Sequence, residues 1–330
     1  MTQISHRICQ EHQQIQYFSL PAATPQHRHR HVLPHGTNWT NLFTSIAGAD
    51  GTADRFFEER RIKWWSSPVT GDPRWLRGPT HNALSSQVAC VNVLLPLRED
   101  PDALTAMLQA LDPEVETVVA VNDGHTERPA SVEFEWVGAK GHRSLEGTAP
   151  TRGQRVTSTD AVLVARLKNG ALRGYLMEWK YVETGDEADK RAGTEGETRR
   201  GRYRQLFETV FKTDATLDNF LVDPAYQLMR LSLLARQVLD KQQLPGVTSM
   251  RTVLVCPREN FAYRKLRADG LLRARFQVDT LVEVMRAGLR EPQTFIDTSP
   301  AELVQAVRRA RTPGTDRVTW LAYMAHRYGW

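Results

Sequence analysis

The sequence predicts an α/β fold, and three observations carry this prediction. Residues 131–137 alternate between apolar and acidic side chains, which is the two-residue period of a strand with one buried face. Residues 156–167 and 172–182 form two further strand candidates joined by an Asn-Gly turn, a strong hairpin signal. An amphipathic helix over 224–241 is followed by a β-branched segment at 251–256, which suits a central strand.

The N-terminal part of the chain shows little periodicity. Residues 1–80 are rich in His, Arg, Pro, Gly and Trp, so we expect a mixed extension with a short helix at 53–64. Apolar residues then recur with helical spacing over 82–97, where Pro96 should end a core helix.

The segment before the long helix is strongly hydrophilic. Residues 184–202 carry glycines and charges of both signs, and we expect a mobile loop there. Asp223 is a candidate cap for the following helix and Pro224 a candidate first-turn residue. Gln227 and Arg230 lie on the polar face of this helix, opposite its leucines.

The remainder of the chain is expected to be mainly helical. Helices are predicted at 278–286 and 300–311, the second with Ser299 and Glu302 in capping-box spacing. The aromatic tail over 320–330 should pack back on the core.

We therefore divide the chain into an N-terminal extension (1–80), a core (81–257) and a helical C-terminal region packed on that core (258–330). The 330 residues are 41% hydrophobic and 25% charged, a normal globular balance. The net charge of +5 favours an acidic partner such as nucleic acid, although the excess is small and spread along the chain.

Three cysteines far apart fit a reducing compartment rather than a disulfide framework. No stretch approaches the ~18 apolar residues of a membrane span, and no secretory signal precedes the first helix. We expect a cytoplasmic protein with no membrane association.

Asp160 and the tripeptide Glu178-Trp179-Lys180 are the residues most indicative of chemistry. Glu178 and Lys180 project to the same face of a strand. If Asn169-Gly170 were a two-residue turn, Glu178 would face Ala161. A three-residue loop with a left-handed Gly170 instead places Asp160 directly across from Glu178, and we predict this second register.

Two carboxylates about 5 Å apart at the backbone repel each other and favour a hard divalent cation, Mg²⁺ or Mn²⁺. A metal-activated water would serve as the nucleophile, and Lys180 would orient that water or stabilise the oxyanion. Glu135 and Glu146 are candidate additional metal ligands. The expected function is a metal-dependent nuclease that hydrolyses phosphodiester bonds, with DNA as the expected substrate. Gln227 and Arg230 are candidate substrate-binding or supporting residues, and together with Tyr226 they also fit a plain polar helix face.

Plainer interpretations remain open for each of these groups. Asp160, Glu178 and Lys180 also fit a cross-strand ion pair on a solvated sheet face. The acidic residues of strand 131–137 fit its polar side, opposite Val132, Phe134 and Trp136. The basic stretch His27-Arg28-His29-Arg30-His31 favours a solvated loop facing nucleic acid over a metal site. Trp64, Trp65 and Trp75 fit packing anchors as well as platforms for bases.

The order of helix, three strands, helix and strand over 81–257 resembles the PD-(D/E)XK nuclease superfamily, whose core is a mixed sheet of αβββαβ succession. More narrowly, the chain is similar to the restriction-endonuclease-like PGN_0703-like group in the segments Leu84-Ser85-Ser86-Gln87, Asn92, Phe134-Glu135, Thr157-Ser158-Thr159-Asp160-Ala161, Glu178-Trp179-Lys180-Tyr181 and Tyr226-Gln227-Leu228-Met229-Arg230. The chain departs from the superfamily pattern in having Thr159 where the nominal proline stands.

The resemblance implies a restriction-endonuclease-like sheet flanked by helices, catalytic roles for Asp160, Glu178 and Lys180, and a supporting position for Tyr181. It leaves two alternatives open: a nucleic-acid-binding protein of the same fold without activity, and an RNA-cleaving nuclease in a defence or toxin setting. A homodimer is a further possibility, since many duplex cutters use two active sites.

Overall fold

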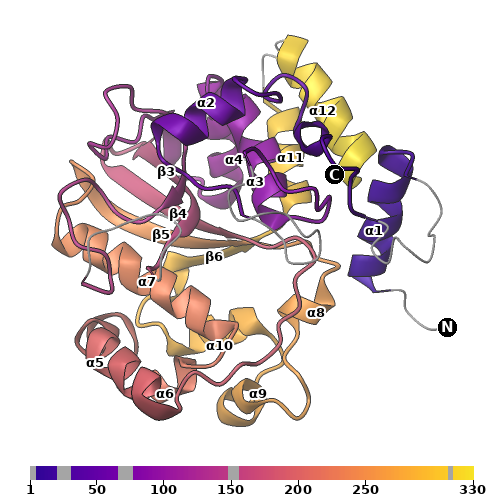
Figure 1. The fold of residues 1–330 in the computed structure, drawn as a ribbon. Helices are drawn as coiled ribbons and strands as arrows, with labels where there is room; N and C mark the ends of the chain where they lie inside the picture. Colours follow the sequence, from indigo (N-terminus) through magenta and orange to yellow (C-terminus); the bar gives the residue numbers. More distant parts are fainter. Residues whose placement is uncertain (1–4, 21–30, 66–76, 148–155, 311–314) are drawn as a thin grey trace.

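A computed structural model describes residues 5–20, 31–65, 77–147, 156–310 and 315–330 of the chain. A six-stranded sheet runs through the molecule with helices on both faces (Figure 1). Its strands are β1 (Val115–Val119), β2 (Glu133–Trp136), β3 (Thr159–Leu167), β4 (Leu172–Trp179), β5 (Val247–Val255) and β6 (Phe295–Thr298). The order is β1-β3-β4-β5-β6, with β2 also pairing β3.

The sheet is mixed. Strand β3 is antiparallel to β1, β2 and β4, whereas β4, β5 and β6 are parallel. The predicted α/β class is therefore confirmed, and the architecture is consistent with a restriction-endonuclease-like fold. Strands β1 and β6 were not predicted. Since Val119 pairs with Val164 and Glu133 with Val162, β1 and β2 occupy successive stretches of one edge of β3.

Helices cover the two faces of the sheet in separate groups (Figure 1). One group comprises α1 (His6–Tyr17), α2 (Thr52–Glu59), α3 (Ser86–Leu94), α4 (Pro101–Leu111), α11 (Pro300–Arg308) and α12 (Thr315–Tyr328). The other comprises α5 (Gly193–Val210), α6 (Leu217–Phe220), α7 (Ala225–Asp240), α8 (Phe261–Arg264), α9 (Leu271–Phe276) and α10 (Leu281–Gly288). Short 3₁₀ turns lie at Asn38–Asn41, Leu95–Leu97 and Pro292–Thr294.

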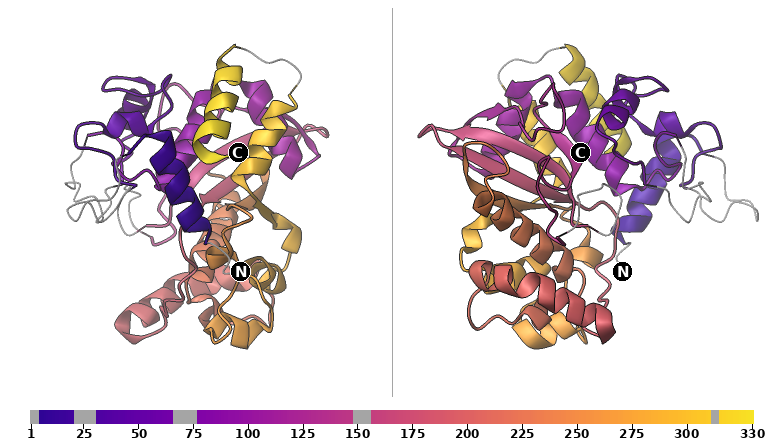
Figure 2. Two further views of the ribbon diagram at one scale, coloured as in Figure 1. Left: turned by 90° about the vertical axis from the view of Figure 1, so that its right-hand side faces the viewer. Right: turned by 60° about the vertical axis from the view of Figure 1, so that its left-hand side comes forward.

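Strand alternation divides the core between these groups. In β3, Ala161 and Leu163 pack with α3 and α4, whereas Val162 and Val164 pack beneath α7. The first core also contains residues as distant in sequence as Leu42 and Trp330. In both views of Figure 2, α5 lies in an outer layer beyond α7, on the side of the molecule away from α12.

The β3–β4 hairpin has the predicted register. Ala161 pairs with Met177 and Arg166 with Leu172, so the same alignment sets Asp160 across from Glu178. Gly170 has φ +84° and its N–H donates to the carbonyl of Leu167 at 2.8 Å, as a three-residue loop requires.

The mobile loop predicted at 184–202 is wrong in its second half, because α5 begins at Gly193. Ion pairs stabilise this hydrophilic helix: Glu195 with Arg199, four residues on, and Glu197 with Arg200, three residues on. Farther along, Tyr203 and Phe207 are buried and anchor it to the outer core. The sequence window lacked apolar residues because the anchors come later in the helix.

The start of α7 also differs from the prediction. Pro224 occupies the cap position itself, without a side-chain cap. Asp223 instead forms an ion pair with Lys190 at 3.0 Å. The predicted core helix at 82–97 is shorter than expected and begins at Ser86, because the Ser85 hydroxyl accepts a hydrogen bond from the N–H of Val88.

The helices predicted near 53–64, 278–286 and 300–311 are present as α2, α10 and α11, and Ser299 and Glu302 form the predicted capping box. Helix α2 ends at Glu59, before the left-handed Arg61. Residues 27–30 of the basic stretch and Trp75 lie outside the described residues. Within the described ranges, no helix is long and apolar enough to cross a membrane.

Candidate active site

Three predicted residues meet where β3 begins and β4 ends. Asp160 accepts a hydrogen bond from the backbone N–H of Trp179, with a distance of 2.5 Å to Oδ2. The Lys180 ammonium lies 2.6 Å from Glu178 Oε1, and these two side chains are only 12% and 13% exposed. The structure therefore brings Asp160, Glu178 and Lys180 together, and it does so in a sheltered position rather than on a solvated sheet face.

The carboxylates of this group act on one another. Burial raises the pKa of Asp160 well above its usual value, and the negative charges of Glu178 and Glu135 raise it further. Lys180 and the Trp179 N–H oppose these effects without cancelling them. Asp160 thus stands in a field of negative charge that one lysine does not neutralise.

Lys180 responds in the opposite sense to its surroundings. Burial alone lowers the pKa of its ammonium, but the charge of Glu178, followed by smaller contributions that include Asp160, leaves the pKa well above the usual lysine value. Its ammonium also lies 5.8 Å from the centroid of the Tyr263 ring. This direction favours the ammonium form of Lys180, which donates hydrogen bonds.

Glu135 reaches the site through an unusual backbone conformation. Its φ of +45° lies in the left-handed region, which non-glycine residues seldom adopt. As a result Phe134 packs on the α3 side of the sheet and Trp136 beneath α7. The predicted alternation, with Val132, Phe134 and Trp136 on one face, is therefore wrong at Trp136.

The acidic residues of β2 are not on a solvated polar side. Glu133 is 2% exposed and is bound by the Arg60 guanidinium at 2.8 Å. Glu135 is 7% exposed, and its Oε1 accepts hydrogen bonds from Gln87 Nε2 at 2.9 Å and from the Trp65 indole N–H at 2.8 Å. Both carboxylates are buried and partnered.

Helix α3 supplies residues that sequence reasoning did not assign to the site. Gln87 binds Glu135, and one turn later Cys90 is fully buried, where burial and then the charges of Asp160, Glu135 and Glu178 raise the pKa of its thiol well above the usual value. Cys90 therefore stays protonated and serves as apolar packing. The spacing of residues 87 and 90 on one helix face was the available sequence signal.

Glu146 is engaged elsewhere. Its carboxylate accepts hydrogen bonds from the N–H and hydroxyl of Thr157, at 2.9 and 2.6 Å, and from the Tyr203 hydroxyl at 3.0 Å. Arg230 approaches it at 3.9 Å. These contacts make Glu146 an anchor for the segment that leads into β3, three residues before Asp160.

A basic cleft of about 680 Å³ opens beside this anchor, between α5 and α7. The Arg230 guanidinium lies 4.8 Å from the centroid of the Tyr226 ring, and the guanidinium of Arg199 lies 5.9 Å from the same ring. Within the part of the chain that the structure describes, Arg230 Nε is buried without a hydrogen-bond partner. The lining comprises Glu146, Val156, Lys190, Thr194, Glu195, Thr198, Arg199, Arg202, Tyr203, Tyr226 and Arg230.

Two other predicted residues lie outside this lining. Tyr181 is fully buried, its hydroxyl donating to Gln10 at 2.7 Å and accepting from Gln14 at 3.1 Å, so it has no surface to offer a substrate. Its burial leaves only the supporting position next to Lys180, which stays a prediction. Gln227 is half-buried on α7 and does not line the cleft.

The two neighbouring tryptophans play different parts. Trp64 stacks on Phe57 with ring centroids 3.9 Å apart, so it is a packing anchor. Trp65 is 52% exposed while its indole N–H binds Glu135, which leaves an aromatic surface open at the rim of the carboxylate group.

A mixed sheet between two layers of helices, with two carboxylates on adjacent strands and a lysine directly after one of them, is consistent with a restriction-endonuclease-like fold. Residues 11–329 match the family REase-ARP, described as Restriction Endonuclease associating with ARP, and the chain belongs to this family. No curated protein and no solved structure gives a significant match to the chain.

Proposed function

We propose that this chain is a Mg²⁺-dependent nuclease of the PD-(D/E)XK superfamily that hydrolyses phosphodiester bonds in DNA. The observation that carries the proposal is the sheltered group of Asp160, Glu178 and Lys180 on adjacent strands. Membership of a restriction endonuclease family supports a nuclease. The narrower resemblance to the PGN_0703-like group stays a prediction.

The donor set suits a hard divalent cation. Asp160 and Glu178 offer carboxylate oxygens, and the repulsion that raises the pKa of Asp160 would be relieved by a bound cation. Within the described residues, no three His, Cys, Asp or Glu side chains are already grouped as a metal site. The two carboxylates would thus hold Mg²⁺ together with water and substrate oxygens, as Mg²⁺ prefers.

When bound, Mg²⁺ supplies a water of lowered pKa and positive charge beside the scissile phosphate. The chain's own residues set the surroundings of that reaction. Lys180, held protonated by Glu178, donates hydrogen bonds toward a phosphate oxygen and stabilises the charge that develops there.

The cleft between α5 and α7 is the proposed path of the substrate backbone. Arg230 lies against the Tyr226 ring and contacts the Thr157 hydroxyl and Glu146, and its buried Nε–H has no acceptor among the described residues. Arg202 is exposed and forms no ion pair with a described residue. Such cations bind phosphates irrespective of sequence.

The family description names an association with ARP, and we propose that this chain shares it. Cleavage by a homodimer is proposed on the general ground that both strands of a duplex must be cut.

The test is cleavage of single- and double-stranded DNA and of RNA, with Mg²⁺, with Mn²⁺ and with EDTA. We expect DNA degradation that requires the divalent ion and falls by at least about 10²-fold in Asp160→Asn and in Lys180→Met, since each removes transition-state stabilisation. Lys168→Ala, which removes an exposed lysine at the opposite end of the hairpin, is the matched control and should cleave normally.

Unchanged cleavage in both site variants would overturn the assignment. Binding of DNA without cleavage of any polymer under any metal condition would favour the inactive nucleic-acid-binding alternative. Cleavage confined to RNA would correct the substrate while leaving the site intact.

A further inference from the structure

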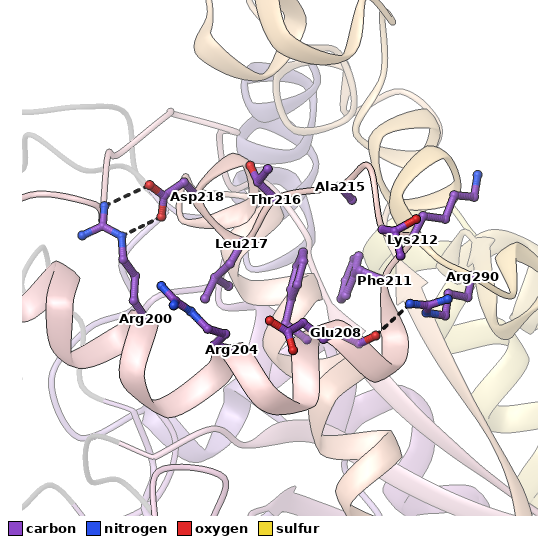
Figure 3. A pocket seen from close by; sticks show the side chains of 12 residues that line it. Arg200, Arg204, Glu208, Phe211, Lys212, Ala215, Thr216, Leu217, Asp218 and Arg290 are labelled. Atoms are coloured by element: carbon purple, nitrogen blue, oxygen red, sulfur yellow. Dashed lines mark hydrogen bonds and ion pairs between the residues drawn. The ribbon is translucent and has the colours of Figure 1, made fainter.

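We propose that a second basic pocket, on the other side of α5, binds backbone phosphates of the same nucleic-acid strand several nucleotides from the bond that is cut. The inference rests on the proposed function and extends it to the path of the substrate. The pocket, called the outer pocket below, has a volume of about 650 Å³ (Figure 3). Its lining comprises Arg200, Arg204, Phe207, Glu208, Phe211, Lys212, Thr213, Ala215, Thr216, Leu217, Asp218 and Arg290.

The outer pocket carries an excess of positive charge. Arg200 is neutralised by Asp218, to which it donates two hydrogen bonds at 2.7 and 3.1 Å (Figure 3). Arg204 and Lys212 have no ion pair with any residue that the structure describes, although both border the cavity. Cations that stand free at the edge of a cavity are available to a ligand.

Arg290 adds a third cation. Among the residues that the structure describes, its guanidinium donates to the backbone carbonyl of Glu208 alone, at 3.0 Å, and this contact does not neutralise its charge. The carboxylate of Glu208 is the single acidic group left after the Arg200–Asp218 pair is set aside. Three cations against one carboxylate predict an anionic ligand.

The floor of the pocket strengthens this attraction. Phe207 and Phe211 stack with ring centroids 4.3 Å apart and, together with Leu217, are buried beneath the charged rim. An apolar floor lowers the local dielectric and concentrates the field of the cations above it. Phosphate groups at the rim, with sugar carbons toward the floor, match this arrangement.

Helix α5 separates the outer pocket from the cleft between α5 and α7, and it contributes side chains to both. Arg199 and Arg202 line the cleft, whereas Arg200 and Arg204, from the same turns, line the outer pocket. An α-helix with its side chains is about 10–12 Å across. A strand advancing about 3.4 Å per nucleotide therefore crosses α5 in roughly three or four nucleotides. A polymer can occupy both sites, which a small phosphate compound cannot.

The experiment is binding by fluorescence anisotropy in EDTA, so that no cleavage occurs and the result does not depend on catalysis. A single strand of about 20 nucleotides is titrated at several salt concentrations against the full chain and against Arg204→Ala/Lys212→Ala. We expect binding weakened about threefold to tenfold, and a slope of log K against log salt that is less steep by about 1.4, since each lost phosphate contact contributes about 0.7.

The matched control is Lys168→Ala/Lys241→Ala, which removes two exposed lysines at the far end of the sheet and should leave affinity and slope unchanged. Equal weakening in both double variants would show a general charge effect and overturn the proposal, as would an unchanged slope in Arg204→Ala/Lys212→Ala. Pyrophosphate that binds the outer pocket without competing with the strand would also overturn it, in favour of a small phosphate ligand.

The outcomes are separable from those of the nuclease test. Loss of cleavage in Asp160→Asn with an unchanged outer pocket supports the active site alone. Weaker binding in Arg204→Ala/Lys212→Ala, in a chain that cleaves no nucleic acid, supports the outer pocket alone.

Discussion

Glu135 shows how one residue's backbone builds part of the site. The left-handed φ costs on the order of 1–3 kcal/mol, and it is retained because Gln87, Trp65 and the packing of Phe134 and Trp136 on opposite faces fix it. Asp160, Glu178 and Lys180 were predictable because strand period and loop length determine their meeting. Nothing in an alternating sequence signals that the alternation will break at Glu135.

The repulsion of Asp160 by Glu178 and Glu135 predicts that the carboxylate of Asp160 destabilises the folded chain. The variant Asp160→Asn keeps an oxygen to accept the Trp179 N–H but removes a buried negative charge beside Glu178 and Glu135. We expect its thermal midpoint in EDTA at neutral pH to rise by about 1–2 °C, as a gain near 1 kcal/mol would give in a chain of 330 residues. Differential scanning calorimetry measures this directly.

Saturating Mg²⁺ should raise the midpoint of the wild-type chain, because a ligand that binds only the folded state stabilises it. The same ion should leave Asp160→Asn nearly unshifted. A lower midpoint in Asp160→Asn than in the wild type would contradict the repulsion argument, because it would mean that the negative charge of Asp160 stabilises the fold.

At the scale of elements, structure that depends on neighbouring residues could be predicted from the sequence, whereas structure that depends on distant contacts could not. The register of the β3–β4 hairpin follows from three adjacent residues ending in Gly170, and the prediction was confirmed. Helix α5 is stabilised by the ion pair of Arg200 with Asp218 and by the burial of Phe207 against other helices. Because these partners are distant in sequence, the local sequence predicts a loop. The cations of α5 were missed for the same reason.

The junction between α4 and β1 is held to β4 by one carboxylate, which predicts a pH-dependent stability. Asp112 Oδ2 accepts hydrogen bonds from Arg173 at 2.5 Å and from the Tyr175 hydroxyl at 2.8 Å. Burial raises the pKa of Asp112, but the hydrogen bonds from Arg173, Tyr175 and the backbone N–H of Glu114, together with the charge of Arg173, lower it more, and the net pKa lies below the usual 3.8. Replacing Asp112 by Asn should cost about 3 kcal/mol at neutral pH, because Arg173 loses its buried partner.

A carboxyl whose folded pKa is depressed contributes its full stability above the unfolded pKa and loses it as the pH falls through the folded pKa. In urea unfolding, the loss of unfolding free energy caused by Asp112→Asn should therefore stay constant from neutral pH down to about pH 4 and become smaller below that pH. Glu114→Gln, whose carboxylate also contacts Arg173 but is 65% exposed, is the control and should cost less than about 1 kcal/mol. If the loss of unfolding free energy in Asp112→Asn were the same at pH 7 and well below pH 4, the ion pair with Arg173 would be excluded as its cause.

At the scale of the whole molecule, contacts between remote segments complete the fold. The predicted return of the aromatic tail is confirmed by the Trp320 indole, which donates to the carbonyl of Asn92 on α3 at 3.0 Å. Composition alone indicated that such a tail would be buried. It could not indicate which helix would receive it, because the partners are more than 200 residues apart in the chain.

Arg327 on α12 joins segments that are far apart in the sequence. This fully buried guanidinium donates to Gln14 Oε1 on α1 at 3.0 Å, to the Asn41 carbonyl at 2.5 Å and to the Tyr323 hydroxyl at 2.6 Å. Its removal takes a buried donor from each of these acceptors, of which the Asn41 carbonyl keeps a hydrogen bond from Asn92 Nδ2 at 3.0 Å. We expect Arg327→Ala to lower the free energy of unfolding by about 3–5 kcal/mol in urea titrations, and to expose α1 to limited proteolysis.

Arg327→Lys should recover only part of this loss, because an ammonium cannot reproduce the planar fork that reaches three acceptors at once. Arg309→Ala, at the exposed end of α11, is the control and should change stability by less than about 0.5 kcal/mol. The free energy of unfolding of Arg327→Ala could instead lie within about 1 kcal/mol of the wild-type value. Helices α1 and α12 would then be held together by their aromatic packing, in which the ring centroids of Tyr17 and Tyr323 lie 5.9 Å apart, and not by this hydrogen-bond network.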